Sequence, residues 1–244
     1  MLLHGLFGSG DNLRAIARGL EDQFQVILPD LPNHGTSSHI GSSTHEAMVD
    51  SIAAFLREHV PGRPVVGGHS IGGKLAMLLC LREPDSYPAL VSIDMAPRPY
   101  QASHLEILEG MRGIPMADVK ARRDADEMLA PAVPDPGVRG FLLKNLVRDN
   151  GVFRWRLDLE AIERDYDNML GWRPPSSSFE GPSLFVGGDR SRYFQADRDT
   201  DLIRQWFPSA DIHTIQDAGH WLHADKPAEV VQVIRSFLLR VDLP

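Results

Sequence analysis

The feature that most constrains the fold is a short apolar run that ends in glycines, carries one serine and continues into an apolar helical pattern. Residues 65–79 read Val-Val-Gly-Gly-His-Ser-Ile-Gly-Gly-Lys-Leu-Ala-Met-Leu-Leu. Residues 68–72 fit G-x-S-x-G, the nucleophile elbow, in which a strand turns sharply into a helix with the serine at the apex. Glycine two positions before and two after Ser70 removes side chains that would collide with the neighbouring chain. Ser70 then stands at a helix N-terminus, where free N–H groups favour developing negative charge.

The same stretch also resembles a phosphate-binding P-loop. Gly68, four further residues and Gly73-Lys74 match its first part, but a P-loop needs Ser or Thr next to hold magnesium, and position 75 is Leu. We therefore prefer the serine interpretation to the nucleotide one.

The net charge of −8 disfavours nucleic acid and anionic membranes as main partners.

The length of 244 residues predicts one large domain, or one domain with a sizeable insertion. The single cysteine, Cys80, permits no internal disulfide, which fits a reducing compartment. No run is apolar for long enough to span a membrane, and the N-terminus has no basic region followed by a long apolar one. We therefore expect a cytoplasmic protein with no membrane span.

Short strands and helices alternate over the first part of the chain and again near its end. The expected strands cover residues 2–3, 24–28, 65–69, 89–93, 183–188 and 211–215. Helical spacing of apolar residues follows most of them, including residues 44–60 and a terminal helix that begins near Pro227. Short crossovers between strands of unbroken apolar character imply a mostly parallel sheet with helices on both faces.

The alternation stops at residues 96–100, which read Ala-Pro-Arg-Pro-Tyr. From there to about Ser178 the pattern is mostly helical, and no core strand is expected. The expected helices cover residues 103–111, 116–129, 137–148 and 159–166, with an extended stretch at 151–157. We therefore expect a core made of residues 1–97 and 179–244, interrupted by a helical cap made of residues 98–178.

Two candidate catalytic side chains follow from their positions along the chain. Ser70 is the expected nucleophile, and the histidine of a serine triad comes last in this type of sheet. His220 follows the last expected strand directly and precedes the terminal helix, so it is the expected base. His223 lies one helical turn away, and the pair resembles half a metal site. Because no third ligand is suggested, we expect no metal and no cofactor.

The acid has two candidates. It normally follows the strand before the last one, three residues after a glycine, but that position, counted from Gly188, is Ser191. Asp189 lies two residues earlier. Asp94 ends the strand at 89–93, at the edge of the sheet where active sites of open α/β folds lie. Asp94 is therefore favoured over Asp189.

A hydrolytic serine also needs an oxyanion hole and a pocket. Ile71 supplies one backbone N–H, and the His-Gly-Leu-Phe turn at residues 4–7 supplies the other, from Leu6 in preference to Phe7. Apolar cap residues are expected to line an acyl pocket. The predicted lining residues of the core and cap are His4, Phe7, His69, Phe141, Leu142, Trp155 and Trp221.

Further motifs add a family resemblance. They include residues 4–9, Asn-His-Gly at 33–35, Ile-Asp-Met-Ala-Pro at 93–97, Gly-His-Trp at 219–221 and His-Ala-Asp-Lys-Pro at 223–227. Together they resemble the serine esterases of the α/β-hydrolase superfamily found in bacteria, and their mitochondrial relatives, over nearly the whole chain. The resemblance implies a helical lid, no cofactor, and action on small or medium acyl esters, extending to thioesters such as acyl-CoA. It also supports Asp94, because position 191 is serine in that family too.

One departure from the family concerns the N-terminus. The family has two further strands before the His-Gly turn, whereas this chain begins at Met1 inside what should be the third. Either the start is recorded late or the sheet is shortened. We therefore expect exposed edge pairing around Leu2-Leu3 and a loosened oxyanion turn.

The expected reaction is acyl-ester hydrolysis through an acyl-enzyme on Ser70. Three alternatives stay open within the fold: an acyltransferase, a C–C bond hydrolase and a cofactor-free haloperoxidase-like enzyme. A catalytically weak protein that keeps the pocket as a ligand receptor is the alternative from a different class. The sequence does not determine acyl-chain length, the alcohol, or the oligomeric state.

Overall fold

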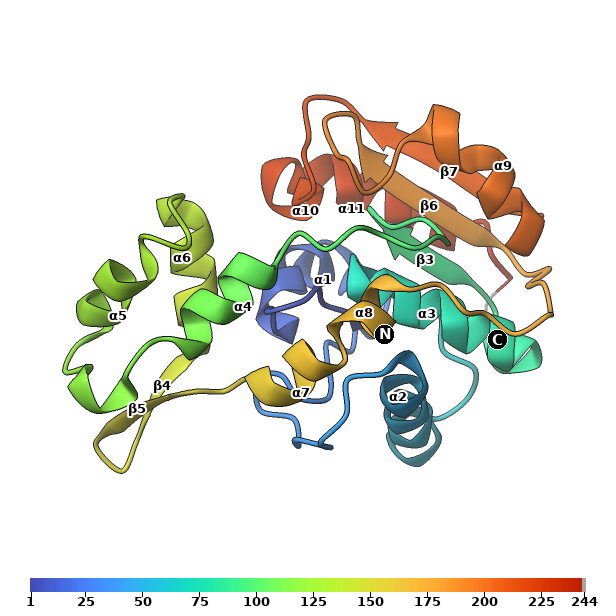
Figure 1. Cartoon of the computed structure of the whole chain (residues 1–244). Helices are drawn as coiled ribbons and strands as arrows, with labels where there is room; N and C mark the ends of the chain where they lie inside the picture. Colours follow the sequence, from blue (N-terminus) through green and yellow to red (C-terminus); the bar gives the residue numbers. More distant parts are fainter. Residues whose placement is uncertain (243–244) are drawn as a thin grey trace.

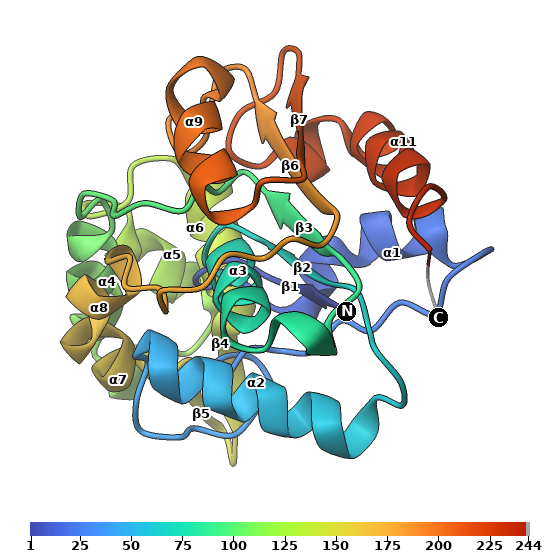
Figure 2. The ribbon, with the colours of Figure 1, turned by 90° about the vertical axis from the view of Figure 1, so that its right-hand side faces the viewer.

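The central element is a parallel sheet. The computed structural model describes residues 1–242 and orders the strands of this sheet β1-β2-β3-β6-β7. Figure 1 shows β3, β6 and β7 side by side, and Figure 2 labels all five strands. Each neighbouring pair runs parallel. The strands are β1 (Leu2–Leu3), β2 (Val66–His69), β3 (Leu90–Ile93), β6 (Ser183–Gly188) and β7 (Ala210–Ile215). The predicted mostly parallel α/β sheet is therefore confirmed.

Helices cover both faces of the sheet (Figure 2). One face packs on α1 (Arg14–Leu20) and α11 (Pro227–Leu238), and the other on α2 (His45–His59), α3 (Ile71–Arg82) and α9 (Ala196–Trp206). Successive strand residues belong to opposite cores, as Leu184 and Phe185 do, because side chains alternate along a strand. No helix within residues 1–242 combines the length and apolar character that crossing a bilayer requires.

The segment at residues 24–28 forms no regular strand, so that prediction is wrong. It lies beside β1, where the backbone N–H of Leu2 donates to the carbonyl of Ile27 at 2.9 Å. Within residues 1–242 no strand pairs with the side of this segment that faces away from β1. The single hydrogen bond to β1 is too little to form a ladder. The segment still covers the sheet edge, because Leu2 and Leu3 are both buried. The expected exposed edge is therefore wrong as well.

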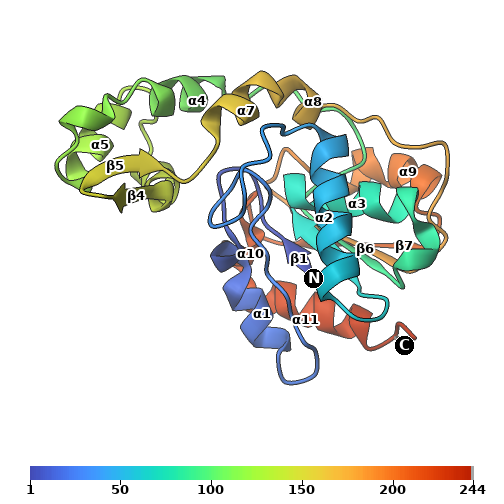
Figure 3. The ribbon, with the colours of Figure 1, turned by 90° about the horizontal axis from the view of Figure 1, so that it is seen from below.

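The chain leaves the sheet after β3 and returns to it at β6. The intervening elements are α4 (Leu105–Arg112), α5 (Arg122–Leu129), α6 (Pro136–Leu142), β4 (Leu146–Asp149), β5 (Val152–Trp155), α7 (Leu159–Arg164) and α8 (Tyr166–Leu170). Figure 3 shows α5 and the β4–β5 hairpin standing away from the sheet. This segment corresponds to the predicted cap, and its boundaries at 98 and 178 stay a prediction.

The cap contains an antiparallel hairpin in place of one predicted helix. The helix expected over 137–148 ends at Leu142, because residues 146–149 pair with residues 152–155. Asn150 and Gly151 form the two-residue turn with φ angles of 49° and 86°. Positive φ at both positions is the geometry that matches the twist of a hairpin, and Asn-Gly favours it. The helix expected over 116–129 is shorter too, since α5 begins only at Arg122.

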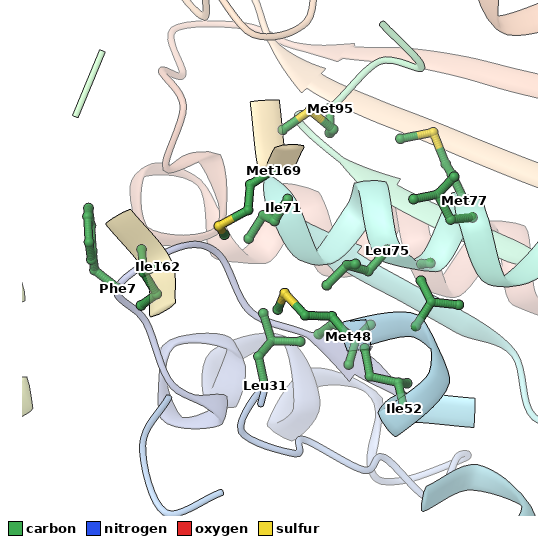
Figure 4. Close-up of a cluster of buried hydrophobic side chains, with 14 of the residues drawn as sticks. Phe7, Leu31, Met48, Ile52, Ile71, Leu75, Met77, Met95, Ile162 and Met169 are labelled. Carbon is green, nitrogen blue, oxygen red and sulfur yellow. The ribbon is translucent and has the colours of Figure 1, made fainter. Parts of the chain in front are cut away.

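Two groups of contacts join α8 of the cap to α3 of the core. The buried Lys74 ammonium of α3 donates to the carbonyls of Met169, Leu170 and Gly171 at 3.3, 3.0 and 2.8 Å. Figure 4 shows the Met169 side chain next to Ile71, the first residue of α3, in the same apolar cluster. These contacts hold the end of α8 against the helix that begins at Ser70.

Candidate active site

Ser70 lies at the tip of a sharp turn between β2 and α3. Its φ of 55° and ψ of −123° are uncommon for a residue with a side chain. A Cβ on Gly68 would lie 2.4 Å from the carbonyl carbon of Gly72, and one on Gly72 would lie 2.3 Å from the Leu3 oxygen. Both glycines are therefore needed for the turn to close. The Ser70 N–H donates to Ile93 at 3.0 Å, which ties the turn to the neighbouring strand β3.

Asp94 and His220 form a close pair at the C-terminal end of the sheet. Nδ1 of His220 lies 2.6 Å from Oδ2 of Asp94, whose side chain is fully buried. The Ser191 hydroxyl donates to the same oxygen, and the N–H of Gly188 donates to Oδ1 at 3.0 Å. The contact between His220 and Asp94 turns Nδ1 toward the carboxylate and leaves Nε2 of His220 for another partner.

The structure brings Ser70, Asp94 and His220 to one end of the sheet but does not join all three. Ser70 and Asp94 follow the neighbouring strands β2 and β3, and the carbonyl of His220 lies 2.8 Å from Nε2 of His69, the residue before Ser70. Among residues 1–242 no hydrogen bond joins the Ser70 hydroxyl to His220. In enzymes without substrate such bonds are often long and tighten when the substrate binds.

Asp189, the second candidate acid, lies elsewhere. Its side chain is exposed, and its Oδ1 accepts a hydrogen bond from the N–H of Ala218 at 3.1 Å. Hydrogen bonds from backbone N–H groups, that of Asp217 first, lower the pKa of Asp189. Its contacts stabilise the turn before His220, whereas the ring of His220 contacts Asp94.

His4 and His69 support the site from below and do not line a pocket as predicted. His4 is fully buried, with Nδ1 at 2.8 Å from the carbonyl of Gly5 and Nε2 accepting from the N–H of Leu31 at 2.9 Å. Burial lowers the pKa of His4 to about 3, so its ring is neutral. His69 is also buried, and desolvation lowers its pKa well below the usual value. His4, which has no exposed surface, cannot touch a substrate, and His69 is only 4% exposed.

The turn at residues 5–8 lies against the elbow. A Cβ on Gly5 would be 3.4 Å from Cβ of Ser70, so this turn is a direct neighbour of the serine. The Gly8 N–H donates to Gly5 at 3.0 Å, and Nδ2 of Asn145 in the cap donates to the Phe7 carbonyl at 2.7 Å. The structure thus has a hydrogen-bonded turn where a loosened one was expected. The N–H groups of Leu6 and Phe7 have no hydrogen-bond partner among the described residues.

The predicted lining residues Phe141, Leu142, Trp155 and Trp221 divide into two sets. The rings of Phe141 in α6 and Trp221 lie 6.0 Å apart, which places the cap beside the residue that follows His220. Trp155 instead donates from Nε1 to Met111 inside the cap at 2.9 Å, and Leu142 is fully buried. Phe141 and Trp221 therefore remain candidates for the pocket. Leu142 belongs to the interior of the cap, and the half-buried Trp155 is held by a hydrogen bond within the cap.

Sequence reasoning missed two groups near His220. The ring of Tyr193 stacks on the His220 ring with centroids 4.0 Å apart. Ser191 supports Asp94, although the sequence indicated only that its position lacks a carboxylate. The position three residues after Gly188 thus contacts the acid without being one. Within residues 1–242, no group of three or more His, Cys, Asp or Glu side chains is placed to hold a metal ion.

The comparison with known families decides the class. The sequence model of a protein family, described as "Alpha/beta hydrolase family", matches residues 1–233. The chain belongs to the α/β-hydrolase family. This α/β hydrolase is 37% identical to sn-1-specific diacylglycerol lipase ABHD11 of Danio rerio, over 98% of this chain and 77% of that protein. It is 34% identical to esterase YbfF of Escherichia coli, over 98% of this chain and 92% of that protein.

A solved structure agrees with these relatives. A marine microorganism esterase matches this α/β hydrolase with a TM-score of 0.92 and 35% sequence identity, covering 97% of this chain and 93% of the other. The predicted resemblance to the esterases of this superfamily is therefore confirmed. The chain is an esterase- or lipase-type α/β hydrolase.

Proposed function

We propose that this α/β hydrolase cleaves small to medium acyl esters through an acyl-enzyme on Ser70. The observation that carries the proposal is the strained turn at Ser70 combined with the 2.6 Å contact between Asp94 and His220 at the same end of the sheet. Both parts are typical of a serine triad, in which the acid orients the histidine and the histidine activates the serine. Asp189 has no part in this mechanism.

The mechanism needs a neutral His220 with its proton on Nδ1. The buried Asp94 carboxylate favours that tautomer, because it accepts a hydrogen bond and cannot donate one when ionised. Nε2 of His220 then takes the proton of Ser70 as the hydroxyl attacks the ester carbonyl. The Asp94 charge stabilises the imidazolium that forms, and Nε2 returns the proton to the leaving alcohol. Water, deprotonated by the same nitrogen, releases the acid and restores Ser70.

The tetrahedral intermediate places a negative charge on the former carbonyl oxygen. In this proposal the N–H groups of Ile71 and Leu6 hold that oxygen, with Phe7 as the second choice on the turn. Support comes from the turn's place next to Ser70 and from the unused N–H groups of Leu6 and Phe7 among the described residues. One such donor contributes roughly 2.7–4 kcal/mol to transition-state stability.

The substrate class rests on the relatives and on the apolar contacts of the site. Relatives are named as an esterase and a diacylglycerol lipase, and Phe141 and Trp221 place apolar surface beside His220. We include acyl thioesters such as acyl-CoA, because the same acyl-enzyme forms from either class. We also propose that the protein acts in the cytoplasm.

Acyl transfer to an alcohol is the second candidate. A Saccharomyces cerevisiae relative, 33% identical over 98% of this chain and 77% of that protein, is named a probable alcohol acetyltransferase. Transfer and hydrolysis share every step up to the acyl-enzyme and differ in whether water or an alcohol attacks it.

The test combines labelling with turnover. A fluorophosphonate probe is expected to label the protein at Ser70, and Ser70→Ala is expected to abolish both labelling and hydrolysis of short p-nitrophenyl esters. Ser86→Ala, which changes an exposed serine, serves as the matched control and should leave both intact. Adding ethanol and measuring ethyl ester against free acid separates transfer from hydrolysis. Full turnover by Ser70→Ala would overturn the proposal.

A further inference from the structure

His104 is a cap residue that lies near the proposed catalytic groups. It directly precedes α4, and its side chain is half-buried. Its ring meets the ring of Phe7 edge-to-face, with centroids 5.9 Å apart, and Phe7 belongs to the turn next to Ser70. Neighbouring Ser103 reaches the same region, since its hydroxyl lies 3.2 Å from that of Tyr193, whose ring stacks on His220. His104 therefore lies between the proposed oxyanion turn and the proposed base.

The hydroxyl of Tyr166 fixes the tautomer of His104. This hydroxyl accepts hydrogen bonds from the backbone N–H groups of Ser103 and His104, at 3.3 and 3.1 Å. A tyrosine hydroxyl has two acceptor sites and one proton to donate. Its remaining contact is Nδ1 of His104 at 2.7 Å, so the proton goes there. Nδ1 is then an acceptor, and the Ser103 hydroxyl, 3.3 Å from the same nitrogen, is a second and longer contact that can donate to it. The ring's own proton is on Nε2.

The Nε2–H group of His104 has no partner of its own. Among residues 1–242 it makes no hydrogen bond, and it is not among the fully buried polar atoms that lack one, so it is open to solvent or ligand. Desolvation, and then the charge of nearby His220, lowers the pKa of His104 to about 4, so the ring is neutral at pH 7. A neutral, oriented N–H donor suits an uncharged oxygen such as an ether, hydroxyl or ester oxygen.

We propose that His104 is a specificity-determining residue that donates a hydrogen bond from Nε2 to a second oxygen in the alcohol part of the ester. This inference rests on the proposed function. His220 must protonate the leaving oxygen, so the atoms attached to that oxygen pass beside His220. Two cap residues reach that region: Ser103, whose hydroxyl contacts that of Tyr193 on the His220 ring, and the neighbouring His104. The preferred substrates are then esters of alcohols that carry another oxygen two carbons away, in preference to esters of simple alkanols.

A matched pair of esters tests the proposal. 2-Methoxyethyl butyrate and butyl butyrate differ only in an ether oxygen that replaces a methylene group, and the readout is the ratio of their kcat/KM values. His104→Phe keeps an aromatic ring and removes the donor, so the ratio is expected to fall about 3- to 10-fold from the value of the native protein, the range for one hydrogen bond. His104→Gln, whose amide nitrogen can take the place of Nε2, is expected to retain most of the ratio. The difference in intrinsic reactivity between the esters cancels, because the ratio is compared between variants.

Two further variants complete the design. Tyr166→Phe removes the hydroxyl that fixes the tautomer and leaves His104 in place, so the ratio should fall by a smaller factor, even if His104→Phe does not fold. His213→Phe changes an exposed histidine of β7 and should leave the ratio unchanged. An unchanged ratio in both His104→Phe and Tyr166→Phe would overturn the inference. Equal losses of kcat/KM for the two esters would be such a result, because they leave the ratio as it is. Neither result would affect the proposed function, which depends separately on loss of turnover in Ser70→Ala.

Discussion

The hydroxyl of Ser191 and the ring of His220 contact the same oxygen, Oδ2, of Asp94. The other oxygen accepts from the N–H of Gly188. Three donors, one from the last residue of β6 and two from the segments after β6 and β7, thus orient one buried carboxylate that follows β3. Ser191, at the position after β6 where an acid could stand, therefore supports the acid from β3, and the first two predictions below depend on this arrangement.

Replacing the carboxylate should separate the two candidate acids. We expect Asp94→Asn to lower kcat by roughly 10³- to 10⁴-fold, because the amide can donate to Nδ1 and favours the wrong tautomer of His220. Asp189→Asn is the matched control and should change kcat by less than about 3-fold, since its carboxylate contacts only the turn before His220. Steady-state hydrolysis of p-nitrophenyl butyrate measures both. Equal losses in the two variants would contradict the assignment.

Removing the Ser191 hydroxyl should act on turnover through Asp94. Hydrogen bonds to a charged group contribute about 1.5–3 kcal/mol, so Ser191→Ala is expected to lower kcat by about 10-fold or more. KM should stay near its native value, because the Ser191 side chain is buried and contacts Asp94. The measurement is kcat and KM for the same ester. A rise in KM with unchanged kcat would show that Ser191 contacts the substrate instead.

The elbow should tolerate no side chain at Gly72. A Cβ there would lie 2.3 Å from the Leu3 carbonyl oxygen and 2.5 Å from that of His4, so Gly72→Ala must displace β1 or α3. We expect a loss of about 3 kcal/mol or more in the free energy of unfolding, or failure to fold. Gly140→Ala is the control in α6, where a Cβ meets nothing within 4 Å, and it should stabilise by about 0.5–1 kcal/mol. Urea unfolding measures both, and similar values for the two variants would count against this account of the elbow.

The hydrogen bond between the cap and the turn can be tested with one isosteric change. Nδ2 of Asn145 donates to the carbonyls of Phe7 and Leu142, so Asn145→Asp sets a carboxylate oxygen against two carbonyl oxygens. We expect a loss of about 2–4 kcal/mol in the free energy of unfolding and a lower kcat. The control is Asn168→Asp, because Asn168 uses its oxygen to accept from His45 and aspartate keeps that acceptor. The prediction fails if the two variants are equally stable.

Buried histidines should make the protein sensitive to mild acid. Burial lowers the pKa of His34 and His45 to about 4, against 6.5 for an exposed ring. The unfolded chain therefore binds more protons than the folded one between about pH 6.5 and pH 4. The free energy of unfolding should fall as pH drops through that window, by up to about 1.4 kcal/mol per pH unit for each such histidine.

Urea unfolding at pH 7, 6 and 5 checks the acid sensitivity. His34→Gln is expected to reduce the slope of stability against pH by the contribution of one histidine, whatever it does to stability at pH 7. His213→Gln, at an exposed site, should leave the slope as it is. The same slope in the native protein and in His34→Gln would refute the assignment to His34.

The inner strands of the sheet could be predicted because they are largely apolar runs, whereas the edge strand β7 exposes Asp211 and His213 at alternate positions. Every residue of β6 and of β2 is buried, which is typical of parallel strands covered on both faces. Residues 24–28 have similar composition, yet one hydrogen bond to β1 is not enough for a strand. In the cap, helical spacing over residues 137–148 predicted one helix, whereas the Asn150-Gly151 turn pairs the end of that stretch with the next.

The candidate site divides in the same way. Ser70, Asp94 and His220 could be predicted from local sequence. Ser70 has flanking glycines, Asp94 follows the end of a strand, and His220 lies in the loop after the last strand. The contributions of Ser191 and Tyr166 depend on partners 97 and 62 residues away in the chain. No local pattern encodes such pairings, because they exist only once the strands and the cap have packed.

The sequence separation of 126 residues between Asp94 and His220 has a consequence for how the protein matures. During synthesis the sheet edge at β1–β3 and the whole cap leave the ribosome before the histidine does, and the long chain closure that joins the pair comes late. If the proposed mechanism holds, a nascent or truncated chain without His220 is inert however much of it has folded. In a refolding experiment, the rate at which turnover recovers reports when the C-terminal segment docks. Far-UV circular dichroism reports the helices that form earlier.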